Sequence, residues 1–386
     1  MKFAKRIGQV PAYPFVQISR KIAEKQAQGI DVISFGIGDP DIPTPGPVID
    51  ELQAAALDVP NHRYPESEGL PEFREAVADW YYRRFEITLD SESQVMSLIG
   101  AKEGIGHASL SLIEPGDIAL VPDPGYPVYA VGTLFAGGTS HRMALQASNA
   151  WLPDLSAIPE DIARRATVLW LNYPNNPTGA TAELDFFEEA VAFAKKHKIA
   201  VMHDACYSEV SYDGYKPSSF LQSDGAIDIG VEFHSLSKSY NMTGWRVGMA
   251  VGNAELIDGL MTVKSNLDSG VPQAIQRMAI AAMQAPLNSV DERNSIYQGR
   301  RDMIVSALQH MGLDVSSPKA SLYVWARVPD GYGSEEFTEK LLDDTDVLVM
   351  NGAGYGKCGD GYIRLSVTIP DDRLETALER MSSWNA

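Results

Sequence analysis

The sequence is poor in cysteine, in basic charge and in long apolar runs. Its two cysteines, Cys206 and Cys358, lie far apart, which fits a reducing cytoplasm better than a disulfide framework. Its 32 basic residues stand against 51 acidic ones, and the net charge of −19 repels nucleic acid and anionic membranes. No apolar run reaches the length of a membrane span or a signal-peptide core. We therefore expect a cytoplasmic protein that binds neither nucleic acid nor membrane.

Sequence motifs for metal and dinucleotide sites are also missing. His203 and Cys206 are close in sequence, but no Cys-x-x-Cys or His-Glu-x-x-His pattern surrounds them. Residues 36–38 lack the third glycine of a dinucleotide fingerprint, and the glycines of residues 352–356 have no helical pattern after them. We therefore expect no bound metal and no dinucleotide.

What is present is the composition of an ordinary globular protein, with 45% hydrophobic and 22% charged residues in a chain of 386. This length favours two domains over one. Short apolar runs alternate with longer amphipathic stretches such as residues 184–197, which predicts an α/β fold with a mostly parallel sheet covered on both faces. The expected buried strands are residues 95–99, 118–121, 168–171, 199–202, 231–233 and 247–251.

The last third of the chain has a different pattern. Residues 300–312 are expected to be helical, and residues 323–328 and 362–367 to be strands. We predict a large domain over residues 35–280. A smaller α+β domain would combine an N-terminal arm, residues 1–34, with residues 281–386.

Polar residues follow five of the expected strands directly. In an open, mostly parallel sheet, ligands bind beyond the carboxyl ends of the strands, so these segments are expected to meet around one ligand. The first of them, residues 100–104, is rich in glycine and opens a helix whose free N–H groups suit a phosphate. The others are residues 122–126, 172–179, 203–207 and 234–246.

The segment 235–246 places Lys238 after two hydroxyl residues and ahead of an arginine. A lysine that bonds covalently to an aldehyde needs an amine that can lose its proton. Ser235, Ser237 and Arg246 supply hydroxyl donors and a fork-shaped cation that suit a phosphate dianion. Together these groups indicate pyridoxal 5'-phosphate (PLP), although an isolated Ser-x-Ser-Lys is usually only a surface loop.

Four further residues are candidates for holding the cofactor ring. Asp204 follows an apolar strand, where a carboxylate needs a partner such as a pyridinium nitrogen. Tyr207 would lie one helical turn further on if Asp204 opened a helix. Asn176 and Tyr207 suit a phenolate oxygen, and Tyr126 suits stacking on an aromatic ring. Each of them alone has a structural alternative, such as a helix cap at Asp204.

Arg364 interrupts the apolar pattern of residues 362–367. Its bidentate guanidinium suits a substrate carboxylate, and the alternative is a surface arginine on the solvent face of the strand.

Taken together, the motifs at residues 173–179, 204–207 and 235–246, with Arg364, resemble the class I/II aminotransferases of fold type I. Their order and spacing match over nearly the whole chain. The resemblance implies a PLP-dependent homodimer, in which small-molecule amino acids and 2-oxo acids react at active sites shared between the subunits.

The resemblance also implies roles for individual residues. Lys238 would hold the cofactor covalently and then move a proton, while Asp204 and Tyr207 complete the catalytic set. Tyr64 would reach the cofactor of the partner subunit, and Arg364 would bind the substrate carboxylate. The other cofactor-binding residues implied are Ala101, Lys102, Tyr126, Asn176, Ser235, Ser237 and Arg246.

Within this family the chain looks most similar to the LL-diaminopimelate aminotransferases of lysine biosynthesis. Lys102 carries much of that similarity, and with Tyr13 and Gly38 it would line the substrate pocket, next to Tyr126, Asn176 and Arg364. One position departs from the plant and chlamydial members. They have a glutamate three residues after the tyrosine that matches Tyr64, whereas this chain has Ser67 between two glutamates.

Three alternatives remain open at this point. The substrate of the same enzyme type could be aspartate, alanine or an aromatic amino acid. The same scaffold could carry a lyase. A PLP-binding regulatory module is the alternative outside enzymes, but it needs a DNA-binding domain, which neither the N-terminus nor the net charge of −19 supplies.

Overall fold

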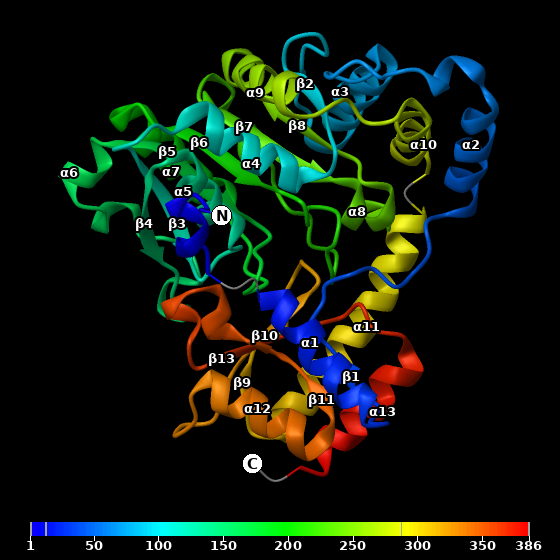
Figure 1. Ribbon diagram of the computed structural model, residues 1–386, viewed down its shortest axis with the longest axis vertical. Helices are drawn as coiled ribbons and strands as arrows, with labels where there is room; N and C mark the ends of the chain where they lie inside the picture. Colours follow the sequence, from blue (N-terminus) through cyan, green and yellow to red (C-terminus); the bar gives the residue numbers. More distant parts are fainter. Residues whose placement is uncertain (1, 12–13, 287, 385–386) are drawn as a thin grey trace.

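The computed structural model of the chain describes residues 2–11, 14–286 and 288–384. Figure 1 shows two groups of strands, one in the upper and one in the lower part of the view, and the long helix α11 (Asn288–His310) runs between them. Among the described residues, no helix combines the length and the apolar character needed to cross a membrane.

The upper group is a seven-stranded sheet with the order β2-β8-β7-β6-β5-β3-β4. Strand β8 runs antiparallel to both of its neighbours, and the other pairs are parallel. The strands are β2 (Val95–Leu98), β3 (Ile118–Asp123), β4 (Thr139–Ala144), β5 (Ala166–Asn172), β6 (Ala200–Asp204), β7 (Gly230–Ser235) and β8 (Gly248–Gly252).

Helices cover both faces of this sheet through two separate apolar cores. One core joins one face to α4 (Ala101–Leu112), α5 (Val128–Ala136) and α9 (Ala254–Leu267). The other core joins the opposite face to α2 (Gly46–Leu57), α3 (Pro71–Phe85), α7 (Leu184–His197) and α10 (Gln273–Gln284). The short helices α6 (Glu160–Ala163) and α8 (Leu236–Ser239) connect strands.

The lower group is a four-stranded antiparallel sheet with the order β12-β13-β10-β9. A third apolar core packs it against α11, α12 (Ser334–Thr345) and α13 (Asp371–Ser382). Its strands are β9 (Asp314–Val315), β10 (Tyr323–Arg327), β12 (Met350–Asn351) and β13 (Tyr362–Ser366). Beside it, β1 (Ile33–Ser34), which follows α1 (Pro14–Ala27), pairs in parallel with β11 (Val347–Leu348).

The six strands and the helix 184–197 expected from the sequence all form, so the prediction of an α/β fold with a mostly parallel sheet is confirmed. Strand β4 was not predicted. It is an edge strand that buries only Met143, so it has no run of apolar residues to reveal it.

Candidate active site

A cavity of about 330 Å³ lies beyond the carboxyl ends of β5, β6 and β7. Ligands bind at this position in mostly parallel sheets. The predicted residues that line it are Gly38, Ala101, Lys102, Tyr126, Asn176, Asp204, Tyr207, Ser235, Ser237, Lys238 and Arg246. The structure therefore brings together residues that are up to 208 positions apart, from Gly38 to Arg246.

Lys238 lies in α8, directly after the end of β7. The Ser235 hydroxyl caps this short helix by accepting the N–H of Ser237 at 3.3 Å, and the Lys238 amine donates to the Gly38 carbonyl at 2.5 Å. Burial disfavours the charged ammonium and lowers the pKa of Lys238 to about 8, although the nearby carboxylate of Asp39 opposes this shift. Near neutral pH, Lys238 is thus neutral far more often than an exposed lysine, as a nucleophilic amine must be.

Helix α4 forms one wall of the cavity and supplies an anion-binding cradle. It begins at Ala101 without a side-chain cap, so its first N–H groups face outward. Gly100 before it has a φ of 76°, and a Cβ there would come within 2.4 Å of the Arg246 guanidinium. That guanidinium donates to the Ser237 hydroxyl at 3.4 Å and the Thr243 carbonyl at 3.0 Å. Helix N–H groups, hydroxyls and a fork-shaped cation converge here, a donor set that suits a phosphate.

Asp204 is the last residue of β6 and is 5% exposed. It accepts hydrogen bonds from the Tyr129 hydroxyl at 2.7 Å and from the Cys206 N–H at 3.2 Å. Burial, reinforced by this carboxylate, raises the pKa of Tyr129 well above its usual range, so Tyr129 stays a neutral donor. A buried carboxylate held in this way can pair with a protonated ring nitrogen.

Asp204 does not open a helix, because the chain forms a turn at residues 206–209, so the condition under which Tyr207 would lie one helical turn further on is not met. Tyr207 still faces the cavity, and its hydroxyl lies 3.0 Å from the Tyr323 hydroxyl.

Arg364 is fully buried in β13, which rules out the surface alternative. Its guanidinium donates to the Asn176 side-chain oxygen at 2.8 Å and to the Gly36 carbonyl at 2.6 Å. The Tyr323 ring centroid lies 3.9 Å from the guanidinium carbon. Asn176 lines the cavity, so Arg364 connects the lower sheet to the wall of the site.

Two of the predicted residues that line the cavity, Tyr126 and Lys102, are not buried. Tyr126 lines the cavity and packs edge-on against Tyr129, with ring centroids 5.8 Å apart. Lys102 is exposed and lines the cavity as well.

At Gly38 a Cβ would lie 2.2 Å from the Tyr323 hydroxyl, so any side chain there would displace that tyrosine.

Three other predicted residues are not among the described residues that line this cavity, and one of them is Arg364, which contacts the lining residues Asn176 and Tyr323. Tyr64 is 92% exposed and does not line it. Tyr13 lies outside the described residues.

The prediction from sequence missed Tyr129 and Tyr323. Tyr129 lies three residues after Tyr126, near the start of α5, and this closeness in sequence could have suggested a shared site. Tyr323 begins a strand that was predicted, but nothing in the sequence marks it as facing Tyr207. The cavity is also lined by Ile37, Ile105, Cys206 and Thr243.

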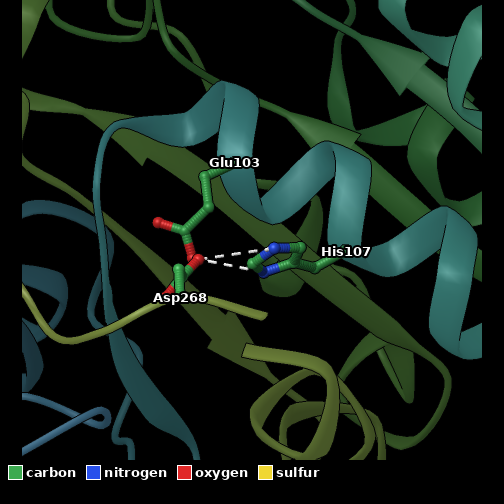
Figure 2. A group of neighbouring side chains, drawn as sticks. All are labelled: Glu103, His107 and Asp268. Carbon is green, nitrogen blue, oxygen red and sulfur yellow. Dashed lines mark ion pairs between the residues drawn. The ribbon is translucent and has the colours of Figure 1, made fainter. Parts of the chain in front are cut away.

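One side-chain cluster near the cradle has the composition of a metal site (Figure 2). Glu103 and Asp268 lie 3.2 Å and 3.4 Å from the two ring nitrogens of His107. However, the fully buried Lys264 donates to the same carboxylates at 2.8 Å and 2.9 Å. Its ammonium supplies the positive charge that both carboxylates need, and we therefore interpret the cluster as an ion-pair network.

The donor set of the cavity fits PLP. The α4 cradle with Arg246 matches the phosphate, the Asp204 carboxylate matches the ring nitrogen, and the amine of Lys238 matches the aldehyde.

The lowered pKa of Lys238 predicts how the cofactor-free protein captures PLP. Only the neutral amine attacks the aldehyde, so the capture rate should rise about tenfold per pH unit below pH 8 and level off above it. Stopped-flow absorbance measures this rate, and dividing it by the rate of Nα-acetyl-lysine cancels the titration of PLP itself. This ratio should be constant below pH 8 and fall above it. A ratio that stays constant up to pH 10 would show that Lys238 is an ordinary lysine.

Sequence and structure comparisons agree with this site. Residues 30–381 match the family model described as aminotransferase class I and II. The chain is 57% identical over 386 residues, covering 100% of both proteins, to an LL-diaminopimelate aminotransferase of Dehalococcoides mccartyi. It is 54% identical over 381 residues to the one of Moorella thermoacetica, covering 99% of this chain and 98% of that protein.

Solved structures give the same result. Substrate-bound BacF from Bacillus subtilis superposes with a TM-score of 0.95 at 33% identity, covering 100% of this chain and 98% of that one. An aminotransferase from Staphylococcus aureus superposes with a TM-score of 0.91 at 34% identity, covering 98% of each chain. These neighbours confirm the predicted fold type I. The chain belongs to the class I and II aminotransferases, which are PLP-dependent enzymes that transfer amino groups.

Proposed function

We propose that this enzyme transfers an amino group between LL-diaminopimelate and 2-oxoglutarate, in the lysine biosynthesis of the cytoplasm. The observation that carries the proposal is identity above 50% over the whole chain to relatives named for this activity. Lys102 lines the cavity. This supports the proposal, because Lys102 is one of the residues by which the sequence resembles those enzymes.

The roles proposed for the site residues follow from their chemistry. When bound, PLP withdraws electrons from the α-carbon of the substrate. Lys238, as a neutral amine, accepts the α-proton at Nζ and returns it. Asp204 keeps the ring nitrogen protonated, and Tyr207 with Asn176 orients the ring oxygen. Arg364 holds the α-carboxylate of the substrate in a bidentate pair.

Arg364, which would bind the substrate, donates a hydrogen bond of 2.8 Å to Asn176, which would bind the ring oxygen of the cofactor. That contact between two buried residues supports the proposal that the carboxylate anchor lies beside a ring-binding residue. A substrate held by both groups would have its α-carbon oriented and fewer unproductive geometries.

We also propose that the enzyme works as a homodimer with shared active sites. Tyr64 is exposed and lies outside the cavity of its own chain. In a dimer, the Tyr64 hydroxyl would bind the phosphate of the cofactor in the partner subunit, and the partner would cover the Tyr64 ring. Leu57 and Val59, which precede it, are 82% and 71% exposed, as apolar residues of an interface are in an isolated subunit.

Mixing two inactive variants tests this arrangement. If Tyr64 serves the partner, a heterodimer of a Lys238→Ala subunit and a Tyr64→Phe subunit contains one intact site of two and should regain about half the wild-type activity. If Tyr64 served its own subunit, every site would carry a defect. The measurement is turnover of the purified, differently tagged heterodimer, with each homodimeric variant as control, and no gain over those controls would refute the shared site.

Substrate choice depends on the distal end of LL-diaminopimelate, which carries a second amino group and a second carboxylate. We propose that Lys102 contacts the distal carboxylate, since this cationic residue lines the cavity. Ser67 lies between Glu66 and Glu68 on the segment that also carries Tyr64, so these carboxylates could reach the distal amino group across the dimer.

The test is a panel of amino donors at equal concentration with 2-oxoglutarate, in which glutamate formation is measured. We expect LL-diaminopimelate to react faster than aspartate, alanine and phenylalanine. Good turnover of aspartate with none of LL-diaminopimelate would refute the substrate and leave the aminotransferase intact. Release of pyruvate without glutamate formation would instead indicate a lyase.

A further inference from the structure

Arg293 is a buried arginine that contacts two segments of the active site from outside the cavity. It lies in α11 and is 4% exposed. One terminal nitrogen donates to the Lys238 carbonyl at 2.8 Å and also to the Ser239 carbonyl. The other donates to the Glu209 carbonyl at 2.5 Å. The guanidinium thus joins the backbone of the lysine helix to the segment that follows Tyr207.

The partners of Arg293 are unusual for a buried cation. Among the described residues, no carboxylate lies within ion-pair distance of it, and the Glu209 carboxylate pairs with Arg84 at 2.9 Å instead. The side-chain oxygen of Asn294 completes the set of acceptors at 2.8 Å. Burial lowers the pKa of Arg293, but a guanidinium stays charged. The backbone carbonyls therefore offset the cost of burying this charge.

Helix α8 needs such a contact because it has a single turn. The carbonyls at its C-terminal end have no partners within the helix, and a helix this short is not stable by itself. A cation at a helix C-terminus stabilises those carbonyls. The position of Lys238 therefore depends on the Arg293 guanidinium at the C-terminal end of α8 as well as on the Ser235 cap at its N-terminal end.

We propose that Arg293 is a positioning residue, which fixes the backbone of Lys238 relative to the Tyr207 segment and thereby aims the lysine amine. This inference rests on the proposed role of Lys238 in proton transfer. It assigns to α11, the helix between the two sheets (Figure 1), a direct part in the geometry of the site.

Arg301 on the same helix provides a matched control. It lies about two turns further along and is 3% exposed. Its guanidinium donates to the Asp213 carboxylate at 2.6 Å and to the Pro318 carbonyl at 3.0 Å. Loss of Arg301 should therefore lower stability without moving the lysine.

The experiment compares the holoenzymes of Arg293→Met, Arg293→Lys and Arg301→Met. We expect Arg293→Met to lower kcat by about 10- to 100-fold, because a small displacement of the amine disrupts proton transfer, and to change the KM of the amino donor by less than about threefold. Arg293→Lys keeps a cation for one of the carbonyls and should recover part of kcat. Arg301→Met should lower Tm while kcat stays within about threefold of the wild type.

Hydrogen exchange of residues 235–242 in the cofactor-free proteins gives a readout that is independent of activity. Exchange should be faster in Arg293→Met and unchanged in Arg301→Met. Equal exchange in both variants, or equal losses of kcat, would overturn the positioning role. If Lys238→Ala retained turnover, the proposed function would fail, but faster exchange in Arg293→Met alone would still support the contact.

Discussion

Lys238→Ala is expected to remove the visible absorbance of the protein-bound cofactor and to lower turnover by about 10⁴-fold or more, because it removes both the covalent attachment and the proton carrier. Lys238 is suited to these tasks because burial lowers its pKa to about 8. The cradle of α4 and Arg246 is untouched by the substitution, so the variant should still bind PLP noncovalently. Absorbance spectra before and after dialysis, together with single-turnover kinetics, measure both effects.

Lys195→Ala is the control for this experiment. Lys195 is an exposed lysine that pairs with Asp228 at 3.3 Å, outside the cavity. The absorbance spectrum and turnover of the Lys195→Ala protein should therefore match those of the wild type. A Lys238→Ala protein that keeps the visible band through dialysis would show that another lysine holds the cofactor.

Asp204→Asn is expected to lower kcat by about 10²- to 10³-fold, since it removes one charge of a buried ion pair while keeping the shape of the side chain. An asparagine can still accept the hydrogen bond that Tyr129 donates at 2.7 Å, so the fold should survive. A neutral partner leaves the ring nitrogen unprotonated and weakens the electron sink. The measurement is kcat with the preferred donor, together with the cofactor spectrum.

Asp123→Asn provides a matched control, because Asp123 also ends a strand and is 5% exposed. Its carboxylate accepts the Cys358 N–H at 2.9 Å and does not line the cavity. If both variants lost kcat equally, the effect of Asp204→Asn would reflect general damage to a buried carboxylate and would contradict its proposed role.

The parts of the fold that sequence predicted are those with a strong local signal. Buried strands such as β5 consist almost entirely of apolar residues, and the amphipathic helix α7 has the bounds that its periodicity predicted. Five polar segments after strands were expected to meet, and the cavity contains residues of all five, together with Gly38.

The rest depends on tertiary contacts that have no local pattern. Tyr323 faces Tyr207 only because the lower sheet packs against the site, and Arg293 reaches Lys238 from 55 residues away. The direction of β8 could not be predicted either, since its sequence is as apolar as that of a parallel strand. The domain limits at residues 35–280 remain our proposal.

The measurement that tests the proposed function most directly runs the reaction in the biosynthetic direction. The holoenzyme is incubated with glutamate and the cyclic keto-acid precursor of LL-diaminopimelate, and the products are separated by chiral chromatography. We predict that LL-diaminopimelate and 2-oxoglutarate form in equal amounts. Consumption of glutamate with oxaloacetate or pyruvate, but none with the cyclic precursor, would contradict the account.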